Sequence, residues 1–264
     1  MKPGSQESTG EQGAGPAPAD GIALSLIVPT LNEEANLPRL LDATLSATDP
    51  LDRPTQIVVA DGGSGDSTRQ LASDRGCDVV RTERGRGHQL AAGAARARCE
   101  ILIFLHADAL PYPGALRSLR VALQDPAIEA CSFAQVIDAD GRFYRLVERT
   151  ADRRARRGWV YGDSGLALRR STYDAIGGFS RQPLFEDLDL SKRLRQRTRV
   201  LIPEGARIGV SPRRWQREGA LWTTVRNWTL THLWRAGIPP RHLQRFYPPA
   251  CRGSVQGTAK PDAN

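Results

Sequence analysis

Apolar and polar residues form blocks along the first half of the chain, and the blocks have the lengths of strands and helices. Short apolar runs rich in β-branched residues, such as Ile101–Leu105, are typical of strands buried on both faces. Between these runs, leucine or alanine recurs at helical spacing, as in the leucines from Leu37 to Leu45. The pattern predicts strands at 22–28, 56–60, 78–81 and 101–105, and helices after Glu34, at 69–75 and at 88–97.

This alternation predicts an α/β fold with a mostly parallel sheet and right-handed crossovers. Because α/β folds of this length are often undivided, we expect a single domain over residues 21–250. The ends, 1–20 and 251–264, consist mainly of small and polar residues with few large apolar side chains. Such composition does not offset the entropy of ordering, so both ends are expected to be disordered.

The excess of basic residues indicates which classes of molecule the protein binds. Lys and Arg outnumber Asp and Glu by 37 to 29, a formal net charge of +8, and many arginines follow residue 140. This balance suits nucleotide phosphates, an acidic membrane surface or nucleic acid, although no aromatic-basic motif favours nucleic acid. The four cysteines are scattered singly, which favours a reduced, cytoplasmic setting. No apolar run approaches the roughly 20 residues of a membrane span, so we expect a soluble or peripheral protein.

Polar side chains follow the predicted strands. Glu33, Asp61 and Asp108 come after three of them, and Arg86 lies in a further loop. Each residue alone has an ordinary explanation as a turn former or helix cap. Together they gather at the carboxyl edge of the sheet, where open α/β sheets bind ligands. His106 lies two residues before Asp108, so in extended backbone both side chains would address one ion or phosphate.

The glycine-rich segment Asp61–Thr68 allows a ligand to approach the backbone closely. It contains no G-x-G-x-x-G, and the chain has no G-x-x-x-x-G-K-[S/T], which counts against dehydrogenases and P-loop enzymes. The acidic side chain before the glycines suits a hydrogen bond to a base or ribose.

Three segments, Val28–Glu34, Asp61–Thr68 and the strand leading to Asp108, resemble the opening blocks of a family-two glycosyltransferase of the GT-A fold. More narrowly, Gly85–Ala94 and Leu105–Asp108 resemble a bacterial subgroup often labelled as arsenosugar-biosynthesis-type or radical-SAM-associated glycosyltransferases. The resemblance implies a Rossmann-like sheet flanked by helices, with a C-terminal helical extension. It also implies a nucleotide-binding half over 21–115 and an acceptor half over 116–250.

The resemblance also implies a donor site with a metal. Asp108 matches the final acid of the D-x-D motif, which holds a divalent cation against the donor diphosphate, and His106 replaces the first acid. Mg²⁺ prefers oxygen and Mn²⁺ accepts imidazole more easily, so the expected cofactor is Mn²⁺ or Mg²⁺, bound by Asp108 and His106. The positions that match nucleotide and donor contacts are Pro29, Thr30, Asn32, Glu33, Asp61, Gly62, Arg86, His106 and Arg214.

Glu186 and Asp187 open a predicted helix that runs to Leu194. Acids at a helix start are ordinary, because they complement its dipole. The resemblance gives them another role: Asp187 as the catalytic base of an inverting transfer, and Glu186 as its orienting neighbour or substitute.

The acceptor side is expected at Gly162, Asp163, Ser164 and Trp215. The segment Ser211–Trp215 resembles the Q-x-x-R-W element of processive members, with Ser211 in place of the glutamine, which does not favour processivity. A structural stacking of Arg214 on Trp215 is the alternative interpretation.

Two helices remain. Arg142–Arg157 has the charge density of a solvated helix. Gly219–Arg235 carries an apolar stripe, which usually packs against a core. The alternative is a peripheral contact with an anionic membrane, since Trp222, Trp228 and Trp234 lie near basic residues.

The sequence therefore predicts an inverting transfer from a nucleotide-diphosphate sugar to an unidentified small or lipid-linked acceptor. The setting would be the cytoplasm, or the inner face of the membrane. Two alternatives stay open: a nucleotidyltransferase, although Pro29–Glu34 lacks that class's glycine-rich basic loop, and a catalytically weak nucleotide-sugar-binding module, because His106 replaces an acid.

Overall fold

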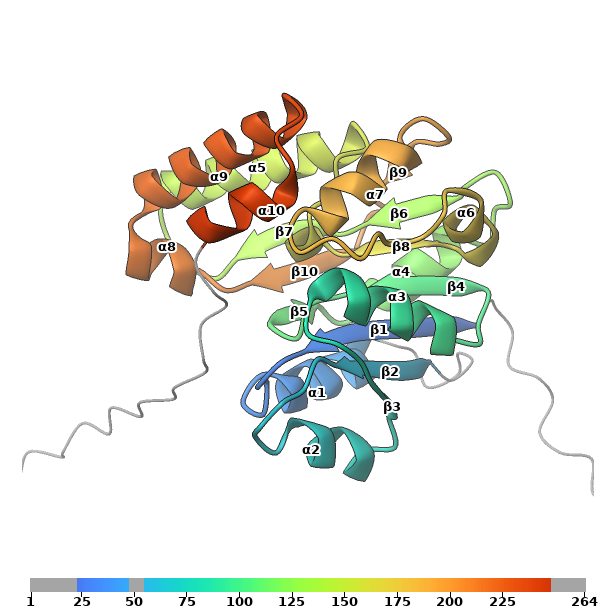
Figure 1. Cartoon of the computed structure of the whole chain (residues 1–264). Coiled ribbons are helices and arrows are strands. Elements are labelled where there is room, and N and C mark those ends of the chain that lie inside the picture. Colours follow the sequence, from blue (N-terminus) through green and yellow to red (C-terminus); the bar gives the residue numbers. More distant parts are fainter. Residues whose placement is uncertain (1–22, 48–54, 248–264) are drawn as a thin grey trace, which may run out of the picture.

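A computed structural model describes residues 23–47 and 55–247 of the chain (Figure 1). The ends predicted to be disordered, 1–20 and 251–264, lie outside these ranges. The described residues form a seven-stranded sheet with helices on both faces and a second sheet of three strands. The predicted α/β fold with a mostly parallel central sheet is confirmed.

The large sheet has the order β3-β2-β1-β4-β8-β6-β9. Its first four strands are mutually parallel, β8 runs antiparallel to both β4 and β6, and β9 pairs in parallel with β6. The strands are β1 (Leu24–Thr30), β2 (Gln56–Asp61), β3 (Asp78–Arg81), β4 (Ile101–Phe104), β6 (Ala130–Ser132), β8 (Leu166–Arg169) and β9 (Val200–Leu201). The small sheet has the order β5 (Ala109–Pro111), β10 (Arg207–Val210) and β7 (Ala134–Ile137).

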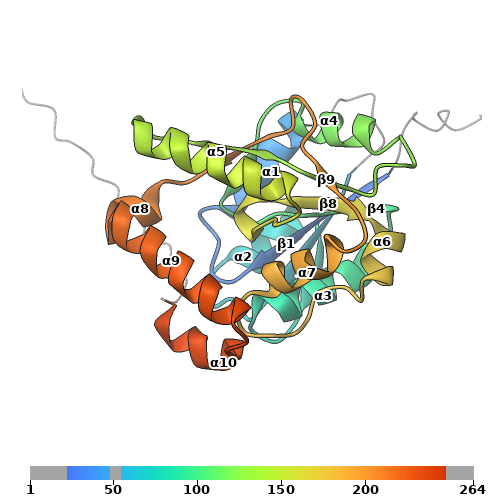
Figure 2. The same ribbon diagram turned by 90° about the horizontal axis from the view of Figure 1, so that it is seen from above.

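Helices flank the large sheet on both sides and crowd one end of the molecule (Figures 1 and 2). They are α1 (Leu37–Ala47), α2 (Thr68–Asp74), α3 (Arg86–Arg96), α4 (Ala115–Ala122), α5 (Arg142–Arg156), α6 (Arg170–Ala175), α7 (Glu186–Leu194), α8 (Arg213–Glu218), α9 (Ala220–Arg235) and α10 (Pro240–Leu243), with short 3₁₀ turns η1 (Gly162–Ser164) and η2 (Gln244–Phe246). None of the described helices is both long and apolar enough to cross a bilayer.

Strand β1 is buried on both faces. Leu24, Leu26 and Val28 point into the cluster that contains the buried side chains of α1 and α4, and Ile27 points into the cluster beneath α3. Helix α3 lies close to the sheet at Gly93, where an added Cβ would stand only 2.4 Å from Cγ2 of Ile27. The fully apolar strand pattern therefore reflects two layers of helices around one sheet.

The stretch after β4 differs from its prediction. Strand β4 ends at Phe104, and the amide of Ala109 donates to the carbonyl of His106 at 3.1 Å, which closes a turn. The extended backbone that would align His106 and Asp108 is therefore absent. Pro111 belongs to β5, at the edge of the small sheet, where a missing N–H is tolerated.

Other boundaries shift by a few residues, and three of the shifts change where a site residue lies. Strand β2 ends at Asp61, so this carboxylate belongs to the strand. Strand β1 continues to Thr30, so Pro29 and Thr30 lie in the strand, and Pro29 pairs with Ala60 of β2. Helix α3 begins at Arg86, which was expected in a loop. Arg86 is therefore the first residue of a helix, and its backbone is fixed by that helix.

Candidate functional site

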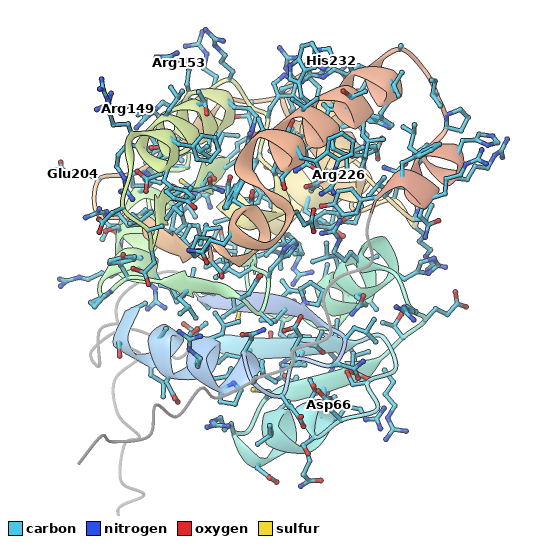
Figure 3. The ribbon with its side chains drawn as sticks, turned by 90° about the vertical axis from the view of Figure 1, so that its left-hand side faces the viewer. Asp66, Arg149, Arg153, Glu204, Arg226 and His232 are labelled. Carbon is cyan, nitrogen blue, oxygen red and sulfur yellow. The ribbon has the colours of Figure 1, made fainter. Side chains whose placement is uncertain are left out.

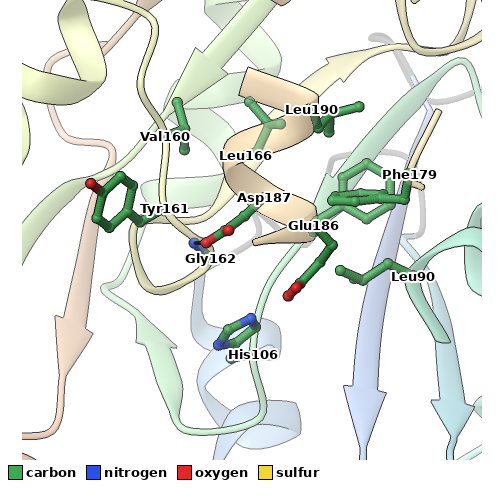
Figure 4. Close-up of a pocket in the computed structure, with 11 residues that line it drawn as sticks. Leu90, His106, Val160, Tyr161, Gly162, Leu166, Phe179, Glu186, Asp187 and Leu190 are labelled. Carbon is green, nitrogen blue, oxygen red and sulfur yellow. Dashed lines mark hydrogen bonds between the residues drawn. The ribbon is translucent and has the colours of Figure 1, made fainter. Parts of the chain in front are cut away.

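A small cavity lies at the N-terminal end of α7 (Figure 4). Its volume is about 20 Å³, close to the space that one water occupies. The polar side chains that line it are His106, Glu186 and Asp187. The rest of the lining comes from Leu90, Phe104, Val160, Tyr161, Gly162, Leu166, Phe179 and Leu190.

Asp187 is held in place by backbone donors. The amide of Gly162 donates to its Oδ2 at 2.8 Å, and the amide of Leu188 donates to its Oδ1 at 2.7 Å. Both carboxylate oxygens thus have a fixed direction without any side-chain donor. Figure 4 shows the Asp187 side chain facing the same space as His106 and Glu186.

Glu186 is almost fully buried and paired with Arg86. Nε of Arg86 lies 2.9 Å from its Oε1, and Oε2 has no hydrogen-bond partner among the described residues. Burial raises the pKa of Glu186, Arg86 opposes the rise and Asp187 adds to it. Burial acts to lower the pKa of Arg86, but Glu186 and Asp187 outweigh it, so that this pKa is raised.

The residue before this acidic pair adopts an unusual backbone conformation. Phe185 has φ 64°, the left-handed region that bulky residues rarely occupy. Its carbonyl accepts from the Gln182 side chain at 2.7 Å, and its ring packs against Trp234 of α9, with centroids 5.8 Å apart. These contacts hold the turn that starts α7 at Glu186. Strained residues of this kind concentrate at functional sites.

The imidazole of His106 fits against a glycine. A Cβ added to Gly162 would stand 2.5 Å from Nε2 of His106, so a side chain at 162 would displace the ring. Burial lowers the pKa of His106 and the nearby Arg86 lowers it further, against the opposite effect of Asp108, Asp163 and Asp187. The ring is therefore neutral at neutral pH, which is the form that binds metals.

Asp108 is exposed at the tip of the turn after β4. Its charge acts on two neighbours: it adds to the raised pKa of Glu33, and it opposes the lowering of the His106 pKa. For Glu33, burial is the largest cause of a raised pKa, and the hydrogen bond from Asn36, at 2.7 Å, opposes it. Glu33 and His106 thus each lie within electrostatic reach of Asp108, as expected for one sheet edge.

Asp61 organises the glycine-rich turn from within. It is fully buried, and its carboxylate accepts from the amides of Gly63 at 3.1 Å and Ser64 at 3.0 Å, and from the Ser64 hydroxyl. Arg69 of α2 lies 3.4 Å away, and Thr30 donates its hydroxyl at 3.4 Å. The carboxylate expected to contact a ligand therefore also holds its own loop.

Asn32 joins the two loops that follow β1 and β2. Its side-chain oxygen accepts from the backbone amide of Gly65 at 2.9 Å, and its backbone amide donates to the Ser64 hydroxyl at 2.9 Å. Its φ of 57° is left-handed, a conformation that asparagine tolerates better than most residues. The donor-side loops are thus one hydrogen-bonded unit.

Gln89 is a functional candidate that sequence reasoning missed. It is buried, and its side-chain nitrogen donates to the carbonyls of Thr30 at 2.6 Å and Ala60 at 3.0 Å. It therefore ties the ends of β1 and β2 together. Gly62 lies against it, because an added Cβ there would come within 3.0 Å of the Gln89 side chain. A polar residue in the alanine-rich face of a predicted helix was the available signal.

Only part of the predicted acceptor side meets at the cavity. Gly162 lines it, and Oδ1 of Asp163 is buried without a hydrogen-bond partner among the described residues. Ser164 is buried and accepts from Gln135 at 3.0 Å, away from the cavity lining. Trp215 of α8 packs edge-to-face on Tyr144 of α5, with centroids 6.3 Å apart. Arg214 also lies in α8, but its side chain is outside those described.

The donor set for a cation is small. Within residues 23–47 and 55–247, no three His, Cys, Asp or Glu side chains form a metal-binding group. Asp108 offers an exposed carboxylate and His106 a neutral imidazole. These residues fit an ion that takes one protein carboxylate and fills its coordination with water and substrate phosphates, as Mg²⁺ often does.

Comparison with known families identifies this arrangement. The family described as glycosyl transferase family 2 matches residues 25–187, more than half of the chain. The chain belongs to glycosyl transferase family 2. The match begins in β1 and ends at Asp187, so it includes the donor-side loops, the turn after β4 and the start of α7.

Curated relatives of this family-2 chain are lipid-directed transferases by name. An undecaprenyl-phosphate 4-deoxy-4-formamido-L-arabinose transferase of Pseudomonas paraeruginosa is 32% identical over 168 residues, which are 60% of this chain and 44% of the relative. The protein of the same name from Pectobacterium atrosepticum is 26% identical over 156 residues, 55% of this chain and 47% of the relative. The chain thus spans less than half the length of these relatives.

Solved structures share the GT-A fold. A mannosyltransferase from Pyrobaculum calidifontis, in complex with GDP-Man and Mn²⁺, aligns with a TM-score of 0.61 at 21% identity, over 89% of this chain and 70% of the other. S. aureus TarS residues 1–349, in complex with UDP-GlcNAc, aligns at 0.56 and 17% identity, over 72% of this chain and 58% of the other. At these identities the likeness shows the fold.

Proposed function

We propose that the protein is an inverting glycosyltransferase that moves a sugar from a nucleotide-diphosphate donor to the hydroxyl of a small or lipid-linked acceptor. The observation that carries the proposal is the position of Asp187. Its carboxylate is fixed by the amides of Gly162 and Leu188 and faces a cavity shared with His106 and Glu186. In the proposed reaction, Asp187 takes the proton of the acceptor hydroxyl as that oxygen attacks the anomeric carbon opposite the departing diphosphate.

The donor would lie along the carboxyl edge of the large sheet. We assign the base and ribose to the unit formed by Pro29, Thr30, Asn32, Glu33, Asp61 and Gly62. Two observations support this assignment: the loops after β1 and β2 are hydrogen-bonded to each other, and Gln89 donates hydrogen bonds to the ends of both strands. Crystals of fold relatives with GDP-Man and UDP-GlcNAc support the same class of donor.

A bound cation and arginine side chains would stabilise the negative charge on the leaving diphosphate. Asp108, assisted by His106, would hold Mn²⁺ or Mg²⁺, and such a cation would stabilise the negative charge that develops on the leaving group. Arg86 is held beside the cavity by Glu186, and its guanidinium side chain is 37% exposed, so that it is open to a ligand. Arg214 is assigned to the same diphosphate through the family resemblance alone.

Glu186 would act as a positioning residue. It is buried, pairs with Arg86 and adjoins Asp187 at the start of α7. Its carboxylate points toward His106 in Figure 4, and its Oε2 has no hydrogen-bond partner among the described residues, which suits a hydrogen bond to a substrate hydroxyl. Gly162, Asp163, Ser164 and Trp215 remain our assignment for the acceptor side, with Gly162 the best supported because it lines the cavity.

For the acceptor, we favour a lipid-linked molecule at the cytoplasmic face of a membrane, because the relatives' name contains undecaprenyl phosphate. The resemblance to the arsenosugar-type subgroup stays a prediction about the sugar pathway. The second candidate is a catalytically weak nucleotide-sugar-binding module or nucleotidyltransferase-like enzyme, since His106 replaces the first acid of the metal motif.

The test is a calorimetric and thermal-shift panel of UDP, GDP, TDP and CDP with their common sugars, with and without Mn²⁺. Metal-dependent binding of one nucleotide, weakened in Asp108→Ala, would support the donor site and name its base. Slow metal-dependent hydrolysis of the bound sugar nucleotide, lost in Asp187→Asn, would separate a transferase from a silent binding module. Absence of binding by every nucleotide would contradict the proposal.

A further inference from the structure

Helix α9 keeps large apolar side chains on its outer surface. Trp222 is 63% exposed, Trp228 is 64% exposed, and Val225 lies between them along the helix. Because these three residues are spaced by three positions, they follow one flank of α9. The sequence interpretation that this stripe packs against the core is therefore wrong for these side chains.

The opposite side of α9 faces the protein and is partly polar. Thr223 and Leu230 are buried there, and the side chain of Arg226 pairs with Glu218 at 2.7 Å. Trp234, the third tryptophan of the predicted membrane face, instead packs on Phe185. The helix thus buries polar groups while two tryptophans remain in solvent, and exposed apolar clusters of this kind mark interaction surfaces.

Helix α5 presents a row of positive charge. Arg142, Arg149 and Arg153 are seven and four residues apart, so they lie on one face of the helix, and all three are exposed. In the part of the chain that the structure describes, none of them has an ion pair or side-chain hydrogen bond. Leu146, which is 61% exposed, lies within the same row.

The two helices lie at the same end of the molecule. In Figure 3, Arg149 and Arg153 of α5 and His232 of α9 project from one end, and Asp66 lies at the other. Figure 1 places α5, α9 and α7, whose first turn carries Asp187, at one end of the molecule, and Figure 2, which looks onto that end, shows α5 and α9 as separate helices on it. Tyr144 of α5 also touches Trp215 of α8, which leads into α9. The basic row and the apolar flank therefore border one surface near the candidate site.

We propose that this α5–α9 surface, made of Arg142, Leu146, Arg149 and Arg153 with Trp222, Val225 and Trp228, docks on an anionic lipid bilayer. The arginines match acidic headgroups, and tryptophan beside aliphatic side chains suits the boundary between headgroups and acyl chains. Nucleic acid would use the arginines, but Leu146 and Val225 would find no counterpart on it. That docking would bring the enzyme to a lipid-linked acceptor rests on the proposed function. The docking itself does not rest on it.

The test is sedimentation of the full-length protein with vesicles of phosphatidylglycerol and phosphatidylcholine in equal parts, and with phosphatidylcholine alone. We expect retention by the anionic vesicles that weakens as salt rises. Each basic residue near such a surface contributes roughly fivefold, so Arg142→Gln/Arg149→Gln/Arg153→Gln should lower the partition coefficient on the order of 100-fold. Trp222→Ser/Trp228→Ser should lower it as well.

The matched control is Arg39→Gln/Arg75→Gln/Arg81→Gln, which removes the same charge from exposed arginines around α1, α2 and β3. Equal loss in the control would show non-specific charge attraction and overturn the proposal. A lack of retention by anionic vesicles would also overturn the proposal. Binding to duplex DNA that needs the α5 arginines, without vesicle retention, would overturn it in favour of nucleic acid. Nucleotide calorimetry on the same variants distinguishes this failure from failure of the donor site, because none of the substituted residues lies in that site.

Discussion

Nε of Arg86, the first residue of α3, lies 2.9 Å from Oε1 of Glu186, the first residue of α7. One ion pair thus joins the starts of two helices that lie a hundred positions apart in the chain. It fixes Glu186 beside Asp187 and leaves part of the guanidinium open toward solvent. The pair couples the stability of this region to the geometry of the candidate site.

Removal of the cation should therefore destabilise the protein. Arg86→Met leaves the buried Glu186 carboxylate without its partner, and we expect a loss of about 2 kcal/mol in the free energy of unfolding, a value lowered from that of a fully buried pair because Arg86 is partly exposed. Urea denaturation measures it. The double variant Arg86→Met/Glu186→Gln should recover part of the loss. Wild-type stability of Arg86→Met would show that the pair does not matter.

Asp187→Asn should separate binding from chemistry. The amide oxygen can still accept from Gly162 or Leu188, so the fold and the donor affinity should stay close to wild type. Loss of the base should lower kcat roughly 10²- to 10⁴-fold. Asp189→Asn is the control. Asp189 lies two residues after Asp187 on the same helix, and its carboxylate pairs with Arg193. Similar losses of kcat in both variants would argue against a special role for Asp187.

Gly162→Ala probes the contact between η1 and His106. The new Cβ would stand 2.5 Å from Nε2 of the ring, so the ring must move, at a cost of about 1–3 kcal/mol of stability and a loss of activity. Adding His106→Ala should restore most of the stability without restoring activity. Gly65→Ala is the steric control, because its nearest neighbour would be 4.0 Å away. Wild-type stability in Gly162→Ala would show that the ring is not held as described.

Gln89→Leu should loosen the donor edge. It removes the side-chain hydrogen bonds to the carbonyls of Thr30 and Ala60, while Thr30 keeps its bond from the amide of Gly62. The loss of these two bonds should cost about 1–3 kcal/mol in the free energy of unfolding. Nucleotide affinity should fall too, because these strand ends carry the donor-side loops. Gln70→Leu is the control, since Gln70 is exposed on α2 and bonds only to Asp74 among the described residues. Unchanged nucleotide affinity in Gln89→Leu would limit Gln89 to a structural role.

Glu33 should make stability depend on pH. Burial raises its folded-state pKa above the ordinary value of 4.5, so the folded state holds its proton more tightly than the unfolded chain does. Its ionisation then removes stability as pH rises from about 4.5 through the raised pKa. Glu33→Gln should be more stable than wild type at pH 7 and equal at pH 4, as measured by urea denaturation at both values. A larger gain at pH 4 than at pH 7 would reverse the sign and exclude this cause.

The order of strands and helices in the donor half could be predicted because it depends on local hydrophobic period. Strand β3 at Asp78–Arg81 and helix α7 at Glu186–Leu194 have the predicted bounds. Glu33 and Asp108 follow strands as expected, and Asp61 is the last residue of β2. Since parallel strands end at one edge, their order along the chain was enough to gather these acids there.

Tertiary structure decided the rest, because it depends on contacts between distant segments. The turn after β4 leads into β5, which pairs with β10, and it leaves Asp108 exposed while His106 is half-buried. The left-handed Phe185 is held by Trp234, nearly fifty residues later in the chain, and no local pattern signals either partner.

The outer helices show the same division most clearly. The sequence by itself determined that α9 would be a helix with an apolar stripe and α5 a helix dense in arginine, since helical period is local. Whether Trp222 and Trp228 pack inward or remain in solvent depends on which face the rest of the fold covers. Burial is a property of the assembled chain, and so only the tertiary structure reveals the surface that α5 and α9 present together.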